Sequence, residues 1–320
     1  MTADHLTTLA DIQAALPLVR ANLHRTPMVA STSLSQMTGV DLRFKAELFQ
    51  KTGSFKPRGI LHKINSLSDE EKRRGVITIS AGNAAQAVAF AAQKLDIPAT
   101  VVMPENAVQS KVEATHGYGA RVVLHGTVKD LFPRMQEIQR QEGQVFIHPF
   151  DDLHVIAGHG TLGLEILDDE PAPDYVFVGV GGGGLISGVA AALRLSNPTV
   201  KVIGVEPEGA PGMTRSLADG QPHHLERVDT IADGLAAPFA GEHCLRHVQA
   251  FVDQVVLVSD SEIIAAMRLI LERCKLVVEP AAAASLAALL FKKVALPANV
   301  KVVCVLSGGN VDMNLFKRIF

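Results

Sequence analysis

The chain has 320 residues, of which 48% are hydrophobic, and it carries a formal net charge of −3. This length and apolar content are sufficient for two domains or for one large α/β unit. The near balance of acidic and basic residues argues against the strongly charged surfaces that bind nucleic acids or anionic membranes. We therefore expect neither a nucleic-acid partner nor a membrane partner.

The three cysteines, Cys244, Cys274 and Cys304, lie far apart and form no C-x-x-C pair. This pattern favours free thiols in a reducing compartment over disulfides or a metal site. The first residues are polar and lack the apolar core of a signal peptide, and no apolar run approaches the ~18 residues of a membrane span. The sequence therefore predicts a cytoplasmic protein.

In the first half of the chain, strand patterns alternate with helix patterns. A helix is expected over residues 8–24, where apolar residues recur at helical spacing. Strands are then expected at residues 40–48, 76–80, 99–103, 121–124 and 145–147, with helices at 84–95, before 116 and at 128–141. This alternation predicts a parallel sheet with right-handed crossovers.

The second half repeats the alternation. Strands are expected at residues 174–179, 201–206, 253–258 and 300–306, and helices at 185–193, at 259–273 and after Glu279-Pro280, with an irregular stretch at 207–230. The two groups of elements predict an α/β protein with two doubly wound domains and a site in the cleft between them. We expect a smaller domain at residues 48–150 and a larger, cofactor-binding domain at 1–47 plus 151–320.

Residues 51–59, Lys-Thr-Gly-Ser-Phe-Lys-Pro-Arg-Gly, place Lys56 between Phe55 and Pro57. The turn residues and the proline predict a loop that enters a helix, with Pro57 at the first helical position. Lys56 would then lie at a helix start, where backbone N–H groups and the positive dipole end disfavour an ammonium. A lowered pKa suits a lysine that forms a Schiff base. The alternative is a solvated surface lysine.

Four small or glycine-containing loops follow predicted strands, at residues 80–85, 179–184, 233–236 and 307–310. The run at 179–184 has glycine at every position but one, so several backbone N–H groups can point at one anion beside the start of the next helix. We interpret it as a phosphate cradle, with a close-packing turn as the alternative.

The same glycine run also permits a dinucleotide interpretation. Gly179, Gly181 and Gly184 satisfy G-x-G-x-x-G, and Glu206 ends the next strand, where a ribose-binding acid is expected. An NAD-dependent dehydrogenase is therefore an open alternative. It leaves Lys56 and Ser307 without a role.

Pyridoxal phosphate would use all of these features. It needs a lysine for its aldehyde, a phosphate cradle, a partner for its ring nitrogen and a donor to its phenolic oxygen. Ser307 can meet the ring nitrogen, Asn83 can donate to the phenolic oxygen, and Phe55 can pack on the ring.

The motifs at residues 51–59, 80–83, 181–184 and 307–310 resemble those of fold-type II pyridoxal-phosphate enzymes. Within that group the chain is most similar to the threonine/serine dehydratases and their serine racemase relatives. His148-Pro-Phe-Asp-Asp, Ala157-Gly-x-Gly160-Thr161, Gly204-Val-Glu-Pro207 and Val278-Glu-Pro280 extend the resemblance over nearly the whole chain.

The resemblance implies pyridoxal 5'-phosphate as cofactor, Lys56 as the catalytic Schiff-base lysine, and a homodimer. Around the cofactor it implies Phe55, Asn83, Ser307 and the phosphate loop Gly181, Gly182, Gly183 and Gly184. For the substrate carboxylate it implies the loop Ser80, Ala81, Gly82, Asn83 and Ala84. For Glu279 and His159 two interpretations stay open, an outer contact of the cofactor and a role in the core or in a loop.

The implied reaction is β-elimination of a 3-hydroxy amino acid, such as L-threonine or L-serine, to a 2-oxo acid and ammonia. Racemase relatives carry a serine at the position of Ala81, so the alanine favours a lyase over an amino-acid racemase. A histidine of the family is replaced by Ala84, which leaves room for a bulkier substrate such as phenylserine; a neutral replacement is the alternative. In the family's cation site Glu206 and Ala210 match, but Gly212 replaces an aspartate, so no tight Mg²⁺ or Ca²⁺ site is expected.

Overall fold

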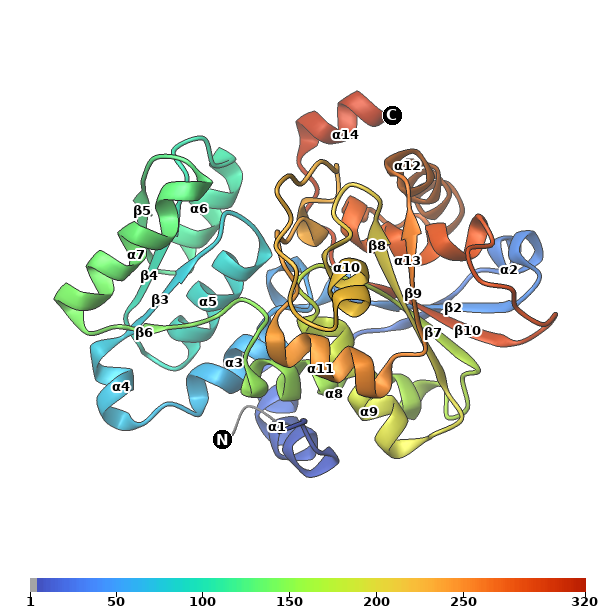
Figure 1. Cartoon of the computed structure of the whole chain (residues 1–320), viewed down its shortest axis with the longest axis horizontal. Helices are drawn as coiled ribbons and strands as arrows, with labels where there is room; N and C mark the ends of the chain where they lie inside the picture. The colour runs from blue at the N-terminus through green and yellow to red at the C-terminus, as the bar shows by residue number, and fades with distance from the viewer. Residues whose placement is uncertain (1–4) are drawn as a thin grey trace.

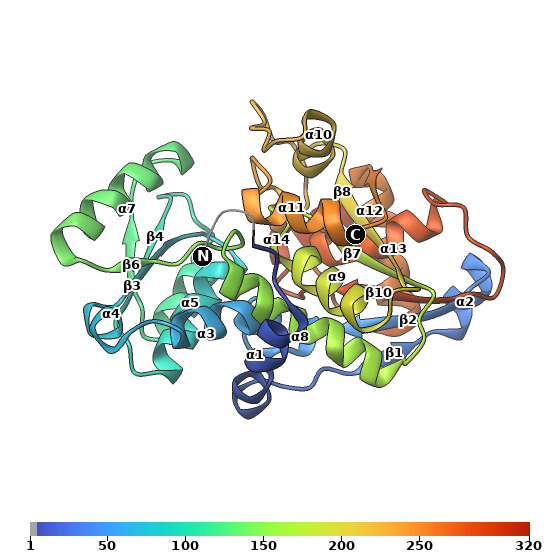
Figure 2. The ribbon, with the colours of Figure 1, turned by 60° about the horizontal axis from the view of Figure 1, so that its bottom comes forward.

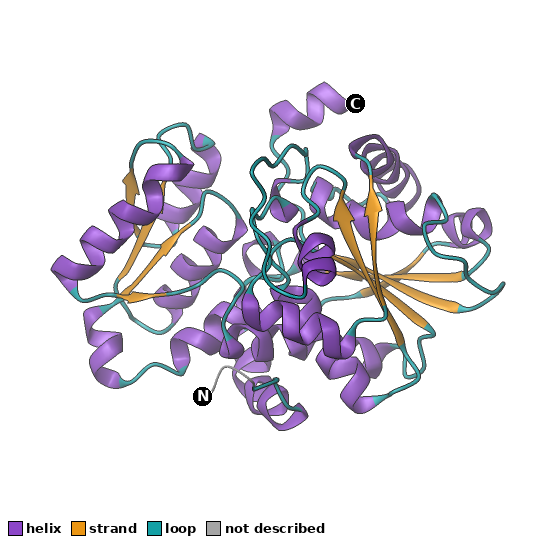
Figure 3. Ribbon diagram, viewed as in Figure 1, coloured by secondary structure: helices purple, strands orange, loops and turns teal. Residues whose placement is uncertain are grey.

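The computed structural model describes residues 5–320, which form two β-sheets with helices on both faces (Figure 1). The two sheets lie in separate halves of the molecule, with helices and loops between them (Figure 3). None of the helices within residues 5–320 combines the length and the apolar character that a membrane crossing requires.

The larger sheet is parallel except at one edge, where β1 runs antiparallel to β2. Its strand order is β1 (Met28–Ala30), β2 (Asp41–Ala46), β10 (Lys301–Leu306), β7 (Tyr175–Gly179), β8 (Lys201–Pro207) and β9 (Gln254–Val258). The helices of this half are α1 (Leu9–Asn22), α2 (Thr32–Thr38), α8 (Leu153–Asp169), α9 (Gly184–Ser196), α10 (Gly212–Asp219), α11 (Glu242–Phe251), α12 (Asp260–Leu269), α13 (Pro280–Leu290) and α14 (Met313–Ile319).

The smaller sheet is fully parallel, in the order β5 (Arg121–Leu124), β4 (Ala99–Met103), β3 (Val76–Ile79) and β6 (Val145–Phe146). Its helices are α3 (Pro57–Asn65), α4 (Asp69–Arg74), α5 (Asn83–Lys94), α6 (Gln109–Gly117) and α7 (Val128–Glu142). Short single-turn helices complete the chain at η1 (Glu47–Phe49), η2 (Lys51–Gly53) and η3 (Asp233–Leu235), and a π-helical turn, η4 (Ile270–Cys274), follows α12.

The larger sheet is buried on both faces, as β10 illustrates. Val302, Cys304 and Leu306 belong to the core that includes α12 and α13, whereas Val303 and Val305 belong to the core that includes α8, α9 and α11. Because successive side chains of a strand point to opposite faces, a parallel strand covered on both sides is apolar throughout. The hydrophobic runs in the sequence therefore correspond to central strands.

The N-terminal helix α1 packs against α3, α8 and α9, beside the junction of the two halves (Figure 2). Its start is fixed by a capping box, in which Thr8 and Asp11 satisfy each other's backbone N–H groups. The predicted domain division placed this helix with the larger domain, and in the structure it contacts α3 of the smaller half as well as α8 and α9.

The expected alternation of strands and helices is confirmed, but some short elements were not predicted. The stretch at residues 207–230 was expected to be irregular, yet it contains α10, whose first turn is held by the side chain of Glu206. The helix expected over 259–273 is α-helical only to Leu269 and ends in the π-helical turn. The strand β1, three residues long, carries too short a pattern to be recognised.

Candidate active site

The loops at the carboxyl ends of strands from both sheets line one cavity of about 490 Å³. Open α/β sheets place ligand sites at these strand ends. All residues predicted to bind cofactor or substrate line the cavity: Phe55, Lys56, Ser80, Ala81, Gly82, Asn83, Ala84, Gly181, Gly182, Gly183, Gly184 and Ser307. The loop at 233–236 also lines it.

Lys56 immediately precedes α3, and Pro57 is the first residue of that helix, as predicted. Its Nζ donates a hydrogen bond to the carbonyl of Pro149 at 2.9 Å and lies 5.2 Å from the centre of the Phe55 ring. Burial lowers the pKa of Lys56 to about 8, while Cys244 and Glu279 oppose the shift. The predicted direction is confirmed, but burial is the main physical cause rather than the helix start alone.

The glycine loop connects β7 to α9 and leaves no space for side chains on its protein-facing side. A Cβ on Gly182 would lie 2.4 Å from the Phe150 ring. Gly183 has φ +99°, and a Cβ there would lie 2.7 Å from the Cβ of Cys244. Within residues 5–320, nothing accepts a hydrogen bond from the N–H groups of residues 181–183. These free donors beside the start of α9 make an anion site.

The loop at residues 80–84 joins β3 to α5 and faces the glycine loop across the cavity. The Oγ of Ser80 accepts a hydrogen bond from the N–H of Gly82 at 3.1 Å, which closes the turn. Ala84, in the first turn of α5, is buried against the cavity. The N-terminus of α5 therefore presents a second set of unpaired N–H groups to the same space.

Asn83, Glu279 and Ser307 form one wall of the cavity. The amide Nδ2 of Asn83 donates to both carboxylate oxygens of Glu279, at 2.9 and 3.0 Å. Burial raises the pKa of Glu279 to about 7, although the hydrogen bond from Asn83 opposes this. The pKa values of Lys56 and Glu279 are thus shifted in opposite directions from their ordinary values, and both groups titrate near neutral pH.

Glu206 does not line the cavity. Its carboxylate accepts hydrogen bonds from the N–H groups of Met213 and Thr214 and from the Thr214 hydroxyl, at 2.6 to 2.8 Å. It therefore fixes the start of α10 and is not placed to bind a ribose at the glycine loop. The carbonyl of Ala210, the other matching cation ligand, accepts from the N–H of Gly212 at 3.0 Å. No cluster of three or more His, Cys, Asp or Glu suited to a metal occurs in residues 5–320.

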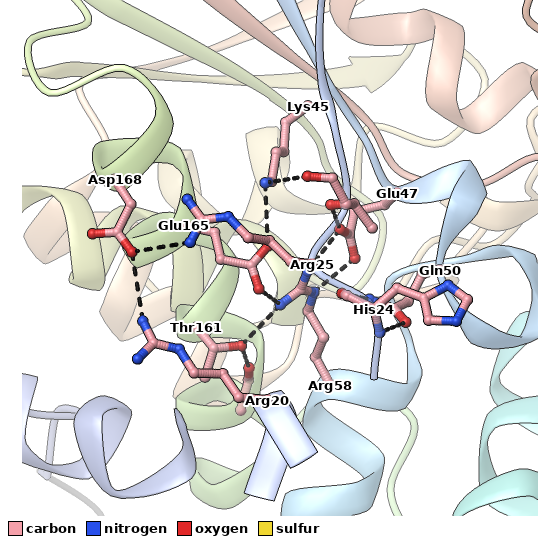
Figure 4. A network of polar contacts seen from close by, with 12 residues as sticks. Arg20, His24, Arg25, Lys45, Glu47, Gln50, Arg58, Thr161, Glu165 and Asp168 are labelled. Atoms are coloured by element: carbon pink, nitrogen blue, oxygen red, sulfur yellow. Dashed lines mark hydrogen bonds and ion pairs between the residues drawn. The ribbon is translucent and has the colours of Figure 1, made fainter. Parts of the chain in front are cut away.

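Behind Lys56, α3 is anchored by a buried ionic network (Figure 4). Arg58, which is fully buried, donates to Glu47 at 2.7 and 2.9 Å and to Glu165 at 2.8 and 2.9 Å. Lys45 contacts Glu165 at 3.1 Å and Asp169 at 2.8 Å. Because α3 carries Lys56 at its start, this network fixes the helix against β2 and α8 and so fixes the position of the lysine.

The cavity mouth is bridged by an ion pair between the two halves. Nζ of Lys111, on α6, lies 2.8 Å from the carboxylate of Asp233, on η3, and both residues line the cavity. The side chain of Asp233 is 62% exposed, so solvent screens the pair and its contribution to stability is small.

With this geometry established, comparison with known proteins identifies the family. A family model described as "Pyridoxal-phosphate dependent enzyme" matches residues 19–308. The chain belongs to this family. Its glycine loop is therefore not the dinucleotide motif of the alternative interpretation, in agreement with the position of Glu206 away from the cavity.

Individual relatives agree with this assignment. The chain is 47% identical to an L-threonine ammonia-lyase of Thermotoga maritima, over 98% of this chain and 78% of that protein. A structure of maize serine racemase superposes with a TM-score of 0.94 at 39% identity and covers 98% of this chain and 97% of that one. Threonine deaminase isoform 2 from Solanum lycopersicum gives a TM-score of 0.91 at 36% identity, over 99% and 95% of the two chains.

The residues of the cavity fit the cofactor of this family. The free N–H groups of residues 181–183 suit its phosphate, and the partly buried Lys56 with a lowered pKa suits its aldehyde. Ser307, only 4% exposed, and Asn83 provide uncharged polar groups on the adjacent wall.

Sequence reasoning missed several residues that shape this site. Pro149, whose carbonyl accepts from Lys56, and Phe150, which backs the glycine loop, lie in the motif at 148–152, which contributed to the family resemblance but was given no role in the site. Arg58 and Glu165 are separated by 107 residues, so no local pattern could pair them. Glu279 was left undecided; its position before the proline of α13 was the available signal.

Proposed function

We propose that this protein is a pyridoxal-phosphate dependent ammonia-lyase that converts L-threonine or L-serine to a 2-oxo acid and ammonia. The observation that carries the proposal is the position of Lys56, partly buried and with a pKa of about 8, in the same cavity as the free N–H groups of the glycine loop. The names of the relatives, threonine ammonia-lyase and threonine deaminase, support this substrate class.

In this proposal each predicted residue has one task in holding the cofactor. The backbone N–H groups of residues 181–184 bind the phosphate. The Lys56 amine binds the aldehyde carbon, Ser307 meets the ring nitrogen, Asn83 donates to the phenolic oxygen, and Phe55 packs on the ring. The N–H groups and side chains at residues 80–84 bind the substrate carboxylate.

When bound, the cofactor supplies an electron-withdrawing ring that stabilises negative charge on the α-carbon of the substrate. The Lys56 amine would be free to act as a base once the substrate amine takes its place at the aldehyde. With its pKa of about 8, it would have a substantial neutral fraction near that pH and could take the proton from the α-carbon. The β-hydroxyl then leaves with a proton as water. Hydrolysis of the resulting enamine gives the 2-oxo acid and ammonia.

The lyase proposal is favoured over an amino-acid racemase of the same family by Ala81. A racemase needs a second proton donor on the opposite face of the α-carbon. Ala81 lines the cavity and has no titratable group. Because a serine racemase is among the similar structures, racemisation is the alternative that the assay must test.

A bulkier substrate is a second candidate. Ala84 lines the cavity, and the small apolar residues Ala107, Val108, Ala236 and Ala237 are also among its lining residues. An aryl-bearing 3-hydroxy amino acid could use this space. Comparison of kcat/KM for L-threonine and L-threo-phenylserine tests the idea, and a clear preference for threonine would exclude it.

We propose further that the protein acts in the cytoplasm and forms a homodimer. In this proposal it binds a small-molecule amino-acid substrate and neither nucleic acid nor membranes. The free thiols Cys244, Cys274 and Cys304 support a reducing compartment, and the dimer rests on the family resemblance. We also propose that residues 48–150 are the smaller domain, and 1–47 with 151–320 the larger cofactor-binding domain, a division supported by the two separate sheets.

The experiment loads the purified protein with pyridoxal phosphate and adds L-threonine or L-serine. The 2-oxo acid and the ammonia are measured together, and the remaining amino acid is resolved by chiral chromatography. We expect equal amounts of the two products, and none from Lys56→Ala. Formation of the D-amino acid without 2-oxo acid would instead establish the racemase.

A further inference from the structure

A chain of hydrogen bonds runs along the wall of the cavity and passes through Asn83. The Asn310 amide nitrogen donates to the carbonyl of Thr52 at 2.7 Å and to Oδ1 of Asn83 at 2.8 Å. The Asn83 amide nitrogen in turn donates to the carboxylate of Glu279 at 2.9 and 3.0 Å. This series of hydrogen bonds therefore joins the turn before Lys56 to the start of α13.

Glu279 is held in place by backbone contacts. Its side chain is buried, its N–H donates to the carbonyl of Gly308 at 3.2 Å, and a Cβ on Gly308 would lie 2.6 Å from its Oε1. In residues 5–320 no lysine, arginine or histidine forms an ion pair with this carboxylate, and Asn83 is the one side chain that hydrogen-bonds to it. Burial of a carboxyl group without an ion-pair partner costs folding free energy. We therefore expect Glu279 to have a function that offsets this cost.

The two neighbours of Asn83 impose the same orientation on its amide. The Glu279 carboxylate accepts hydrogen bonds, so it requires the amide nitrogen on its side. The Asn310 amide nitrogen is a donor fixed by the Thr52 carbonyl, so it requires the amide oxygen on the other side. An amide nitrogen has two hydrogens. When one of them is shared between the two carboxylate oxygens of Glu279, the other is left for the cavity that Asn83 lines.

We propose that Glu279 and Asn310 are positioning residues that hold the Asn83 amide so that it presents an N–H, not its carbonyl oxygen, to the bound cofactor. The inference rests on the proposed function, because it assumes that the cavity binds pyridoxal phosphate through an oxygen beside Asn83. If either positioning residue is replaced, the Asn83 amide can rotate by half a turn and direct its carbonyl oxygen at the cofactor oxygen. The attractive hydrogen bond is then replaced by repulsion between two oxygen atoms.

The test is a double-mutant cycle on the enzyme loaded with pyridoxal phosphate. Glu279→Leu removes the acceptor, and Asn83→Ala removes the group that it positions. The readouts are the dissociation constant of pyridoxal phosphate and the absorption spectrum of the bound cofactor, both independent of turnover. In the wild-type background we expect Glu279→Leu to weaken cofactor binding about tenfold and to shift the absorption band. When it is added to the Asn83→Ala variant, it should change neither the dissociation constant nor the band any further.

A conservative variant separates orientation from charge. In Glu279→Gln an amide oxygen can still accept from Asn83, so most of the cofactor affinity and the position of the band should be retained. The proposal would be overturned if Glu279→Gln weakened cofactor binding as much as Glu279→Leu does. It would also be overturned if Glu279→Leu weakened cofactor binding equally in the wild type and in Asn83→Ala.

If Glu279→Leu does not fold, Asn310→Ala tests the same orientation from the other end of the hydrogen-bond series. It too should weaken cofactor binding in the wild type and have no added effect in the Asn83→Ala variant. Failure of this inference differs from failure of the proposed function. A wild-type protein that shows no absorption band with pyridoxal phosphate would refute the function itself. A wild-type band together with additive variants would refute the positioning role alone.

Discussion

Replacement of Glu279 by glutamine should make the protein without added cofactor more stable at alkaline pH. Burial raises the pKa of this carboxyl group from its ordinary value of 4.5 to about 7, Asp233 adds to the increase, and Asn83 and Lys111 oppose it. Below pH 4.5 the group is protonated in both the folded and the unfolded chain, so the shift has no effect. Between 4.5 and about 7 the unfolded chain releases the proton first, and stability falls as pH rises.

The size of the effect follows from the two pKa values. Each pH unit between 4.5 and about 7 is worth about 1.4 kcal/mol, which gives a total of about 3 kcal/mol. Most of this loss is complete between pH 5 and pH 8. Glutamine does not titrate, yet it keeps an oxygen that can accept from Asn83, so Glu279→Gln removes the loss without removing the acceptor.

The assay is urea unfolding of both proteins at pH 5 and pH 8. We expect the stability of Glu279→Gln relative to wild type to increase by between about 2 and 3 kcal/mol from the lower to the higher pH. The exposed Glu226→Gln is the control, and it should change stability by less than about 0.5 kcal/mol at both values. A difference between Glu279→Gln and wild type that does not depend on pH would refute the reasoning.

Two further pairs of variants test the packing around the site. Arg58→Met leaves the buried carboxylate of Glu47 without its ion-pair partner and removes one of the two cations that contact Glu165, so it should lower the free energy of unfolding by about 3 to 5 kcal/mol. Arg20→Ala removes an exposed pair and should cost less than about 1 kcal/mol, and similar losses of the two variants in urea unfolding would contradict this. Gly183→Ala should weaken pyridoxal phosphate binding at least tenfold in absorbance titrations, because its methyl group would meet the Cβ of Cys244. Gly220→Ala, also at positive φ but in open space, should cost about 1 kcal/mol of stability and leave cofactor affinity unchanged, and equal affinities of the two variants would exclude the packing argument.

The sequence predicted the loops of the site because their geometry is local. A glycine run or a proline after Lys56 acts within a few residues, and parallel strands bring their carboxyl ends to one edge of a sheet. For this reason the residues proposed for cofactor and substrate all line one cavity.

What the sequence could not predict depends on burial and on distant partners. The main cause of the lowered pKa of Lys56 is burial, which is a property of the packed chain. The hydrogen bonds of Glu206 could not be predicted because its partners lie on α10, within the stretch at residues 207–230 that was expected to be irregular. Likewise, the orientation of Asn83 is set by Glu279 and Asn310, about 200 residues away in the chain.

The most direct test of the central claim is reduction of the protein loaded with pyridoxal phosphate by borohydride, followed by mass spectrometry of its peptides. Reduction fixes the cofactor to the amine that holds it. The account predicts one pyridoxyl group per chain, on the peptide that contains Lys56. A pyridoxyl group on another lysine, or on none, would contradict it.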